Sequence, residues 1–272
     1  MLKAIQTNTS LKTALVFGLL FVIPIALGTV LGYQTIGGYL SPLLILIIIW
    51  LLYRSENKTL DELGLIPWKK NWLFLPGGII LGIAIVFISL LVQMINVKVN
   101  FTLNPKADYL QIAGGLFLIL AGVMNEELIF RGYCFKKTAD KNGILIANII
   151  FAFLFMVWHW ISWNAWGNWP VMLGSVTTAI GHILFATAFL SSRTLFFAIG
   201  IHWGINWAQH NIFSFYPAAD IKNNTPAGSL ILLDSPDQQI SQFQEVMNNV
   251  LPGLIVLGIA WLIWNYRKRA TV

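Results

Sequence analysis

The amino-acid sequence predicts an all-α membrane protein, a bundle of about eight transmembrane helices with both termini in the cytoplasm. The first observation is composition: 57% of the residues are hydrophobic and only 10% are charged, whereas soluble domains carry about 25% charged residues. The second is that the apolar residues gather in runs near the length of about 20 residues that a spanning helix needs. The third is the uneven distribution of lysine and arginine between those runs.

Eight apolar runs are found in chain order. The first indicates a retained helix and not a signal peptide, because it is long and no clear small-residue cleavage site follows it. The second is short and has Pro42 near its start, so it is expected to tilt less or to be partly re-entrant. The sixth and seventh are separated only by residues 191–193, which predicts a tight antiparallel hairpin. The runs are about 13–32, 38–53, 73–95, 110–133, 143–161, 171–191, 194–212 and 249–266.

Basic residues predict the orientation of these helices. In an eight-helix arrangement, all of the 17 Lys and Arg residues except Lys98, Lys106 and Lys222 fall on one side. Positive residues favour the cytoplasmic side, so both termini are expected there, in a multi-pass protein of the cell membrane. Residues 55–65 are then a cytoplasmic surface segment. Residues 213–248 form a long external loop, in which 240–246 is either a short interfacial helix or plain loop.

The chain has no evident internal repeat, low-complexity segment or boundary, so residues 1–272 are expected to form a single multi-spanning domain. Its single cysteine, Cys134, allows no intrachain disulfide and excludes Cys-based metal clusters. The net charge of +6 does not indicate nucleic acid, because the basic residues lie in short loops between apolar runs. That pattern is typical of topology signals and of contacts with anionic lipids.

Ionisable residues inside the apolar runs are the main functional signal, because each costs roughly 2.5–3.5 kcal/mol at mid-bilayer. In the fourth run, Glu127 and Arg131 are four residues apart and can pair on one helix face. Whether this pair serves a site or is only a structural tie stays open. Glu126 is turned about 100° away and is expected to face other helices. The ionisable and amide residues in the other runs are His159 in the fifth, His182 in the sixth, and His202 and Asn206 in the seventh.

These residue types have the parts for hydrolysis. A carboxylate and an imidazole can take a proton from water, and His with Asn can donate to a developing oxyanion. At about 1.5 Å per residue, His159 would lie some 27 Å along its helix, against 14–16 Å for Glu126 and His202. The three converge only if the fifth helix is tilted or begins deeper. A mid-membrane cavity is therefore predicted. The sequence does not indicate the side of the membrane to which it opens.

The remaining polar and aromatic residues have simpler interpretations. His182 is expected to be hydrogen-bonded between helices, and His210 to be interfacial. Phe155, taken alone, is core or lipid-facing. An interfacial aromatic belt is predicted for Trp158, Trp160, Trp163, Trp166 and Trp169.

Three motifs in order are more specific than any one of them: Glu126-Glu127-Leu128-Ile129-Phe130-Arg131, Phe155 to His159, and His202 to Asn206. Together they resemble the CPBP family of intramembrane proteases, which includes type II CAAX prenyl endopeptidases and bacterial relatives linked to bacteriocin immunity. The resemblance covers a core of about 110–212. It implies that Glu126 activates water with help from His159, while His202 and Asn206 stabilise the oxyanion. Glu127 and Arg131 would hold Glu126 in place, with Phe155 as a further supporting residue.

The resemblance implies an intramembrane endopeptidase acting on membrane-tethered peptides or proteins, prenylated CAAX-type substrates among them. No cofactor is expected to be required, since His-Glu-x-x-His is absent, and a divalent metal such as zinc on Glu126, His159 and His202 is the alternative. Two other functions stay open: a non-catalytic, immunity-like membrane binding protein, and a transporter or proton relay. The lack of inverted repeats weighs against the transporter. Membrane lipids are the other expected partners.

Overall fold

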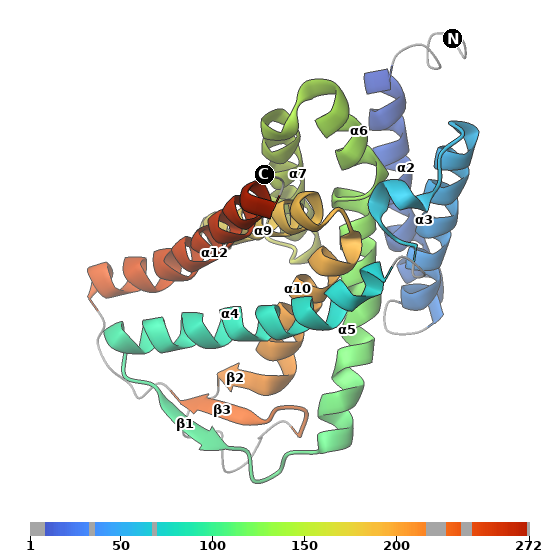
Figure 1. The fold of residues 1–272 in the computed structure, drawn as a ribbon. Coiled ribbons are helices and arrows are strands. Elements are labelled where there is room, and N and C mark those ends of the chain that lie inside the picture. Colours follow the sequence, from blue (N-terminus) through green and yellow to red (C-terminus); the bar gives the residue numbers. More distant parts are fainter. Residues whose placement is uncertain (1–8, 33–35, 67–69, 216–226, 235–240, 271–272) are drawn as a thin grey trace.

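The computed structural model describes residues 9–32, 36–66, 70–215, 227–234 and 241–270, and these fold into a bundle of α-helices with one small sheet (Figure 1). The long helices are α2 (Thr9–Leu31), α3 (Ile36–Ser55), α4 (Phe74–Asn96), α5 (Tyr109–Phe130), α7 (Ile144–Ser162), α9 (Val176–Ser192), α10 (Leu195–Trp207) and α12 (Gln242–Ala270). Shorter elements are α6 (Tyr133–Asn142), α8 (Trp169–Gly174), the 3-10 helices η1 (Leu60–Leu63) and η3 (Asn71–Leu73), and the π-helix η4 (Ala208–Ile212).

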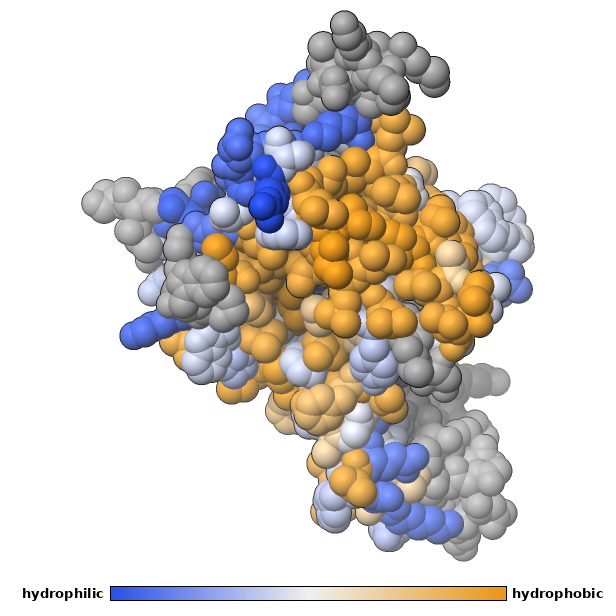
Figure 2. Space-filling view, turned by 90° about the vertical axis from the view of Figure 1, so that its right-hand side faces the viewer, coloured by the Kyte–Doolittle hydropathy of each residue, from blue (hydrophilic) through white to orange (hydrophobic). Residues whose placement is uncertain are grey.

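Seven helical segments within the described residues are long and apolar enough to cross a membrane. They correspond to seven of the eight predicted runs, and the class of a multi-pass, all-α membrane protein is confirmed. The run with Pro42 is a continuous helix, α3, through that proline. Apolar residues also form a broad band across the surface, with hydrophilic residues above and below it (Figure 2).

The seventh predicted run, 194–212, is helical but differs from the others. Its α-helical part, α10, has 13 residues and is about 20 Å long, shorter than the roughly 30 Å of a hydrocarbon core. Most of its side chains from Leu195 to Gly204 are buried, so α10 is a central helix around which the others pack. The predicted hairpin with α9 is present, and Arg193 makes the turn with φ of 60°.

Glycines allow α10 to lie directly against α4. A Cβ at Gly204 would come within 2.2 Å of the Ile79 carbonyl oxygen, and one at Gly82 within 2.3 Å of the Ile201 oxygen. A Cβ at Gly200 or Gly78 would also be crowded by the backbone of the facing helix, at 2.4 and 2.8 Å. Each helix therefore presents two glycines four residues apart, the small-residue spacing that lets membrane helices approach closely.

A three-stranded sheet lies at the opposite end of α5 from α6 (Figure 1). Its order is β1-β3-β2: β1 (Asn100–Leu103) pairs antiparallel with β3 (Ile231–Asp234), and β2 (Phe213–Phe215) pairs parallel with it. The segment predicted as a long loop thus contains two strands. For the segment 240–246, a short interfacial helix and a plain loop were the two alternatives. Residues 242–246 are helical, but they form the first turns of α12 and not a separate helix. Ile240 and Lys222 lie outside the described residues.

The segment 55–65 is a capped turn at the end of the molecule where α2 begins. Thr59 caps η1, and Gly64 ends it with φ of 62°. Close by, the Glu56 carboxylate accepts hydrogen bonds from Lys12, Lys137 and Tyr133, which joins α2, α6 and the end of α3. Lys12 and Lys137 therefore meet at one end of the bundle, while the orientation of that end in the membrane stays a prediction.

Candidate active site

The site is built around the last turns of α5. Asp108 precedes this helix and caps it, because its side chain accepts from the amides of Leu110 and Gln111. The helix ends at Phe130, and Gly132 precedes α6 at a point with no room for a side chain, since a Cβ there would lie 2.1 Å from the Leu128 oxygen. Glu126 and Glu127 therefore lie in rigid helix immediately before a break.

Glu127 is the buried carboxylate of the site and does not line its cavity. Its Oε1 accepts from Arg131 Nη1 at 3.0 Å, and both side chains are fully buried. The predicted pair along one helix face is present. The same oxygen lies 2.7 Å from His202 Nδ1, so Nδ1 carries a proton that it donates to the carboxylate. Glu127 thus ties α5 to α10.

Aromatic rings enclose this cluster. The His202 ring stacks on Phe185, with centroids 4.5 Å apart and planes at 13°. The Arg131 guanidinium lies 4.2 Å from the centre of the Phe155 ring and 5.0 Å from that of Phe185. A guanidinium over aromatic faces is stabilised by their quadrupoles, especially without competing water. Phe155, at 2% exposure, is therefore core that shields the cluster and not a lipid-facing residue.

Glu126 faces a different way, as its 100° offset predicts. Its side chain keeps about a fifth of its exposure (21%), and its Oε2 lies 3.6 Å from His202 Nε2. Its Oε1 accepts a hydrogen bond from the Trp158 indole at 3.0 Å. The carboxylate is therefore held between α7 and α10, with an edge free.

His159 presents one ring nitrogen to the same space. Its Nδ1 lies 2.8 Å from the Phe155 carbonyl oxygen, which can only accept, so Nδ1 carries the proton. In the neutral ring, Nε2 is then the unprotonated nitrogen. Phe155 and Trp163 pack edge-on against the ring, at 4.6 and 4.9 Å, and fix its orientation.

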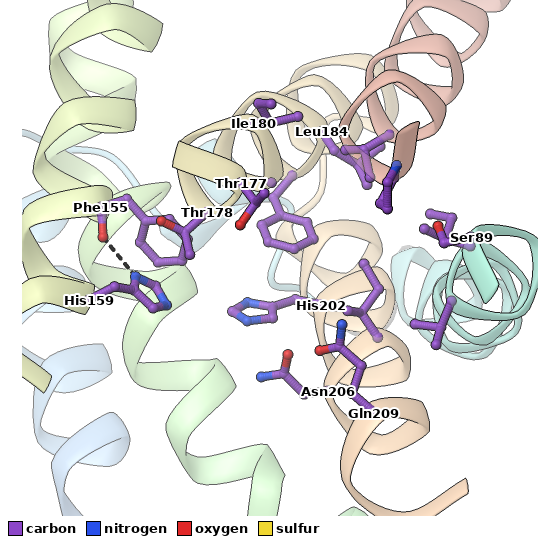
Figure 3. A pocket seen from close by; sticks show the side chains of 18 of the residues that line it. Ser89, Phe155, His159, Thr177, Thr178, Ile180, Leu184, His202, Asn206 and Gln209 are labelled. Carbon is purple, nitrogen blue, oxygen red and sulfur yellow. Dashed lines mark hydrogen bonds between the residues drawn. The ribbon is translucent and has the colours of Figure 1, made fainter. Parts of the chain in front are cut away.

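Glu126, His159, His202 and Asn206 all line one cavity of about 710 Å³. His159 and His202 point toward one another across it, and Asn206 lies one turn further along α10 (Figure 3). The predicted convergence is therefore found, although simple counting along α7 had separated His159 from the others. Polar residues further out in the cavity include Ser89 and Gln93 of α4, Thr177 and Thr178 of α9, and Gln209 and His210 of η4.

A second cavity, of about 530 Å³, reaches Glu126 from another side. It is lined by residues of α2, α3, α5 and α7, among them Phe21, Tyr39, Asn125 and Trp158. Most of its lining is apolar, but Asn125 and Ser41 form a hydrogen-bonded pair there, with Asn125 Nδ2 2.7 Å from Ser41 Oγ. Glu126 therefore lies at the boundary of two cavities.

The interfacial belt stays a prediction, but three of its tryptophans make specific contacts: Trp158 binds Glu126, Trp163 packs on His159, and Trp160 donates to Ser175 Oγ at 2.6 Å. The prediction for His182 was wrong, since this side chain was expected to be hydrogen-bonded between helices. It is fully buried beside Phe135 and Phe155, and neither ring nitrogen has a partner in the described part of the chain.

The alternative of a zinc site rested on Glu126, His159 and His202. Among the described residues, no three His, Cys, Asp or Glu side chains gather as a metal-ligand set. His202 Nδ1 is engaged by Glu127, so Nε2 is the ring nitrogen that faces the cavity. A reaction that needs no metal stays a prediction, and no chemical step is routed through a metal.

Fold and site together define a multi-pass helical membrane protein with a buried Glu–His–Arg cluster at the wall of an internal cavity. Comparison with protein families agrees: residues 108–208 match the model of the type II CAAX prenyl endopeptidase Rce1-like family. This is a protease family, and the matched segment contains all three motifs, so the resemblance predicted from them is confirmed over that segment. No curated protein and no solved structure gave a match.

Proposed function

We propose that the protein is an intramembrane endopeptidase that hydrolyses peptide bonds of membrane-tethered substrates and uses Glu126 to activate the water. One observation carries the proposal: Glu126, His159, His202 and Asn206 come from three helices and line one cavity. The match to a family of CAAX prenyl endopeptidases supports prenylated CAAX-type peptides as the first substrates to test. The mostly apolar lining of the cavity suits a substrate that enters from the lipid phase.

The charges of the cluster fit this chemistry. Glu126 and Glu127 carry two negative charges and Arg131 one positive charge, so protonating His202 makes the group of four neutral. Glu127 already accepts from Nδ1 of His202, which leaves Nε2 of the imidazolium as a donor toward the cavity. Glu127 and Arg131 thus act behind the reacting groups, as supports for His202.

Hydrolysis then proceeds in two proton transfers. The Glu126 carboxylate, helped by Nε2 of His159, removes a proton from water, and the water oxygen attacks the peptide carbonyl carbon. The Nε2–H of His202 and the Asn206 amide donate to the oxyanion that forms. The C–N bond then breaks, and the proton held at Glu126 passes to the leaving nitrogen, which leaves a carboxyl and an amine product.

The test is cleavage of a farnesylated CAAX-type peptide carrying a fluorophore and a quencher, by the purified full chain in detergent or vesicles. Glu126→Gln is expected to lower kcat/KM by at least roughly 10²-fold, the usual contribution of a general base. Glu62→Gln is the matched control, since Glu62 pairs with Lys58 at the surface. Full activity in Glu126→Gln overturns the proposal. A wild-type chain that cleaves neither farnesylated nor unmodified membrane-tethered peptides favours the binding-protein alternative.

A further inference from the structure

Trp158 makes the hydrogen bond that orients Glu126. The indole N–H donates to Oε1 at 3.0 Å, and it is the one hydrogen bond seen for this carboxylate within the described residues. With Oε1 held by α7, the opposite oxygen, Oε2, faces His202 Nε2 at 3.6 Å. An indole N–H can donate a hydrogen bond but cannot accept one. It is therefore a suitable partner for a charged carboxylate, which can only accept.

The indole is in turn fixed from outside the matched domain. Phe21 of α2 packs edge-on against Trp158, with ring centroids 5.1 Å apart and planes at 79°. Phe21 also contacts Phe130, the last residue of α5, with ring centroids 6.5 Å apart. The support of Glu126 therefore runs through α2, which precedes residues 108–208.

Trp158 lies away from the large cavity. It lines the second cavity, of about 530 Å³, and is not among the residues that line the one containing His159, His202 and Asn206. A substrate seated against those three residues would therefore meet Glu126 but not Trp158. A change at Trp158 acts on the rate of chemistry and leaves substrate binding largely intact.

We propose that Trp158 is the positioning residue of Glu126: its indole N–H fixes the carboxylate rotamer that presents Oε2 to the cavity. This inference rests on the proposed endopeptidase function. Without the N–H, the carboxylate loses its hydrogen bond to α7 and can turn into the second cavity.

The experiment compares Trp158→Phe with Trp160→Phe in the peptide-cleavage assay and measures kcat and KM separately. Trp160 is the matched control, because it lies on the same helix and also loses an indole hydrogen bond, to Ser175 and Met172, without touching Glu126. In Trp158→Phe, kcat is expected to fall roughly tenfold to a hundredfold, with KM within about twofold, as for loss of a hydrogen bond to a charged group.

A shape-preserving variant covers the case in which Trp158→Phe folds poorly. Benzothienylalanine at position 158 keeps the bicyclic ring and removes only the N–H, and it is expected to give the same fall in kcat with KM nearly unchanged. If this variant, or a well-folded Trp158→Phe, matches Trp160→Phe in kcat, the inference is overturned.

Failure of the positioning role is distinct from failure of the proposed function. If Glu126→Gln is inactive while the position-158 variants behave like wild type, only the role of Trp158 is lost. If Glu126→Gln cleaves as well as wild type, the endopeptidase mechanism fails, and the role of Trp158 is overturned with it.

Discussion

Glu126 and Glu127 are neighbours in the chain with opposite surroundings. Glu127 is fully buried and shares one oxygen between Arg131 and His202, whereas Glu126 keeps part of its exposure at the wall of two cavities. A buried charge that loses its partner costs about 3–5 kcal/mol, because the remaining charge stays uncompensated. The two residues should therefore respond differently to the same substitution.

Glu127→Gln is expected to lower the free energy of unfolding by about 3–5 kcal/mol, since Arg131 is left buried without a counter-ion. Glu126→Gln should remove activity with a much smaller loss of stability. Thermal unfolding in detergent, followed by intrinsic tryptophan fluorescence, measures both. The double variant Glu127→Gln/Arg131→Met should regain part of the lost stability. Equal midpoints for the two single variants would contradict this division of roles.

At the scale of elements, the contact between α4 and α10 places the residues of α10 that line the site. His202 and Asn206 lie on either side of Gly204, whose Cα faces the backbone of Ile79. The sequence contains the signal, glycines four apart at 78 and 82 and again at 200 and 204, but pattern alone does not say which two helices meet. The same contact with α4 explains why α10, the short helix, lies at the centre of the bundle.

Gly204→Ala is expected to push α10 away from α4, because the added Cβ would lie 2.2 Å from a carbonyl oxygen. Overpacking of this kind costs about 1–3 kcal/mol, and the movement of His202 should lower kcat/KM as well. Gly77→Ala on α4 is the control: its Cβ would meet nothing within 4 Å, and alanine favours the helix by about 1 kcal/mol. The melting temperature and the rate of peptide cleavage are measured for both variants. A Gly204→Ala chain as stable and active as Gly77→Ala would refute the close-packing argument.

At the scale of the whole molecule, the end of the bundle that carries α6 is held together by charge. Glu56 is partly desolvated, which raises its pKa, but hydrogen bonds from Lys137, Tyr133 and Lys12 outweigh this and lower the pKa to about 2. A carboxylate with a depressed pKa contributes stability that is fully present above its ordinary value of 4.5. That contribution is lost as the pH falls toward 2.

The wild-type chain should therefore lose stability between about pH 4.5 and pH 2, and part of this loss should be absent in Glu56→Gln. Melting temperatures in detergent at pH 7, 4.5 and 3 measure the difference. At pH 7 the variant is expected to melt lower, and the gap should narrow as the pH falls. A constant gap at all three values would show that Glu56 contributes through packing and not through charge.

The orientation in the membrane is a prediction at the same scale. Lys12, Lys136, Lys137 and Lys141 lie at one end of the bundle, and Lys98 and Lys106 lie near the sheet at the other. Reporter proteins whose signal depends on the side of the membrane are fused to each terminus. Both fusions are expected to give the cytoplasmic signal. A terminus that reports from the external side would contradict the charge-based topology.

The sequence by itself determined what depends on short-range geometry. Composition and run length identified the membrane class, because a helix that crosses the hydrocarbon core needs about 20 consecutive, mostly apolar residues. The four-residue spacing predicted the Glu127–Arg131 pair, and the three motifs indicated the residue types of the site. All of these depend on neighbours along one helix.

Only the tertiary structure decided how helices cross. Counting along α7 misplaced His159, since depth in a bundle depends on tilt, which packing against other helices controls. For the same reason, an indole read as interfacial proved to bind Glu126, and His182 proved to lack the expected hydrogen bond. Period and composition fix which face of a helix a residue occupies, but its partner across space is chosen by the packing of the whole bundle.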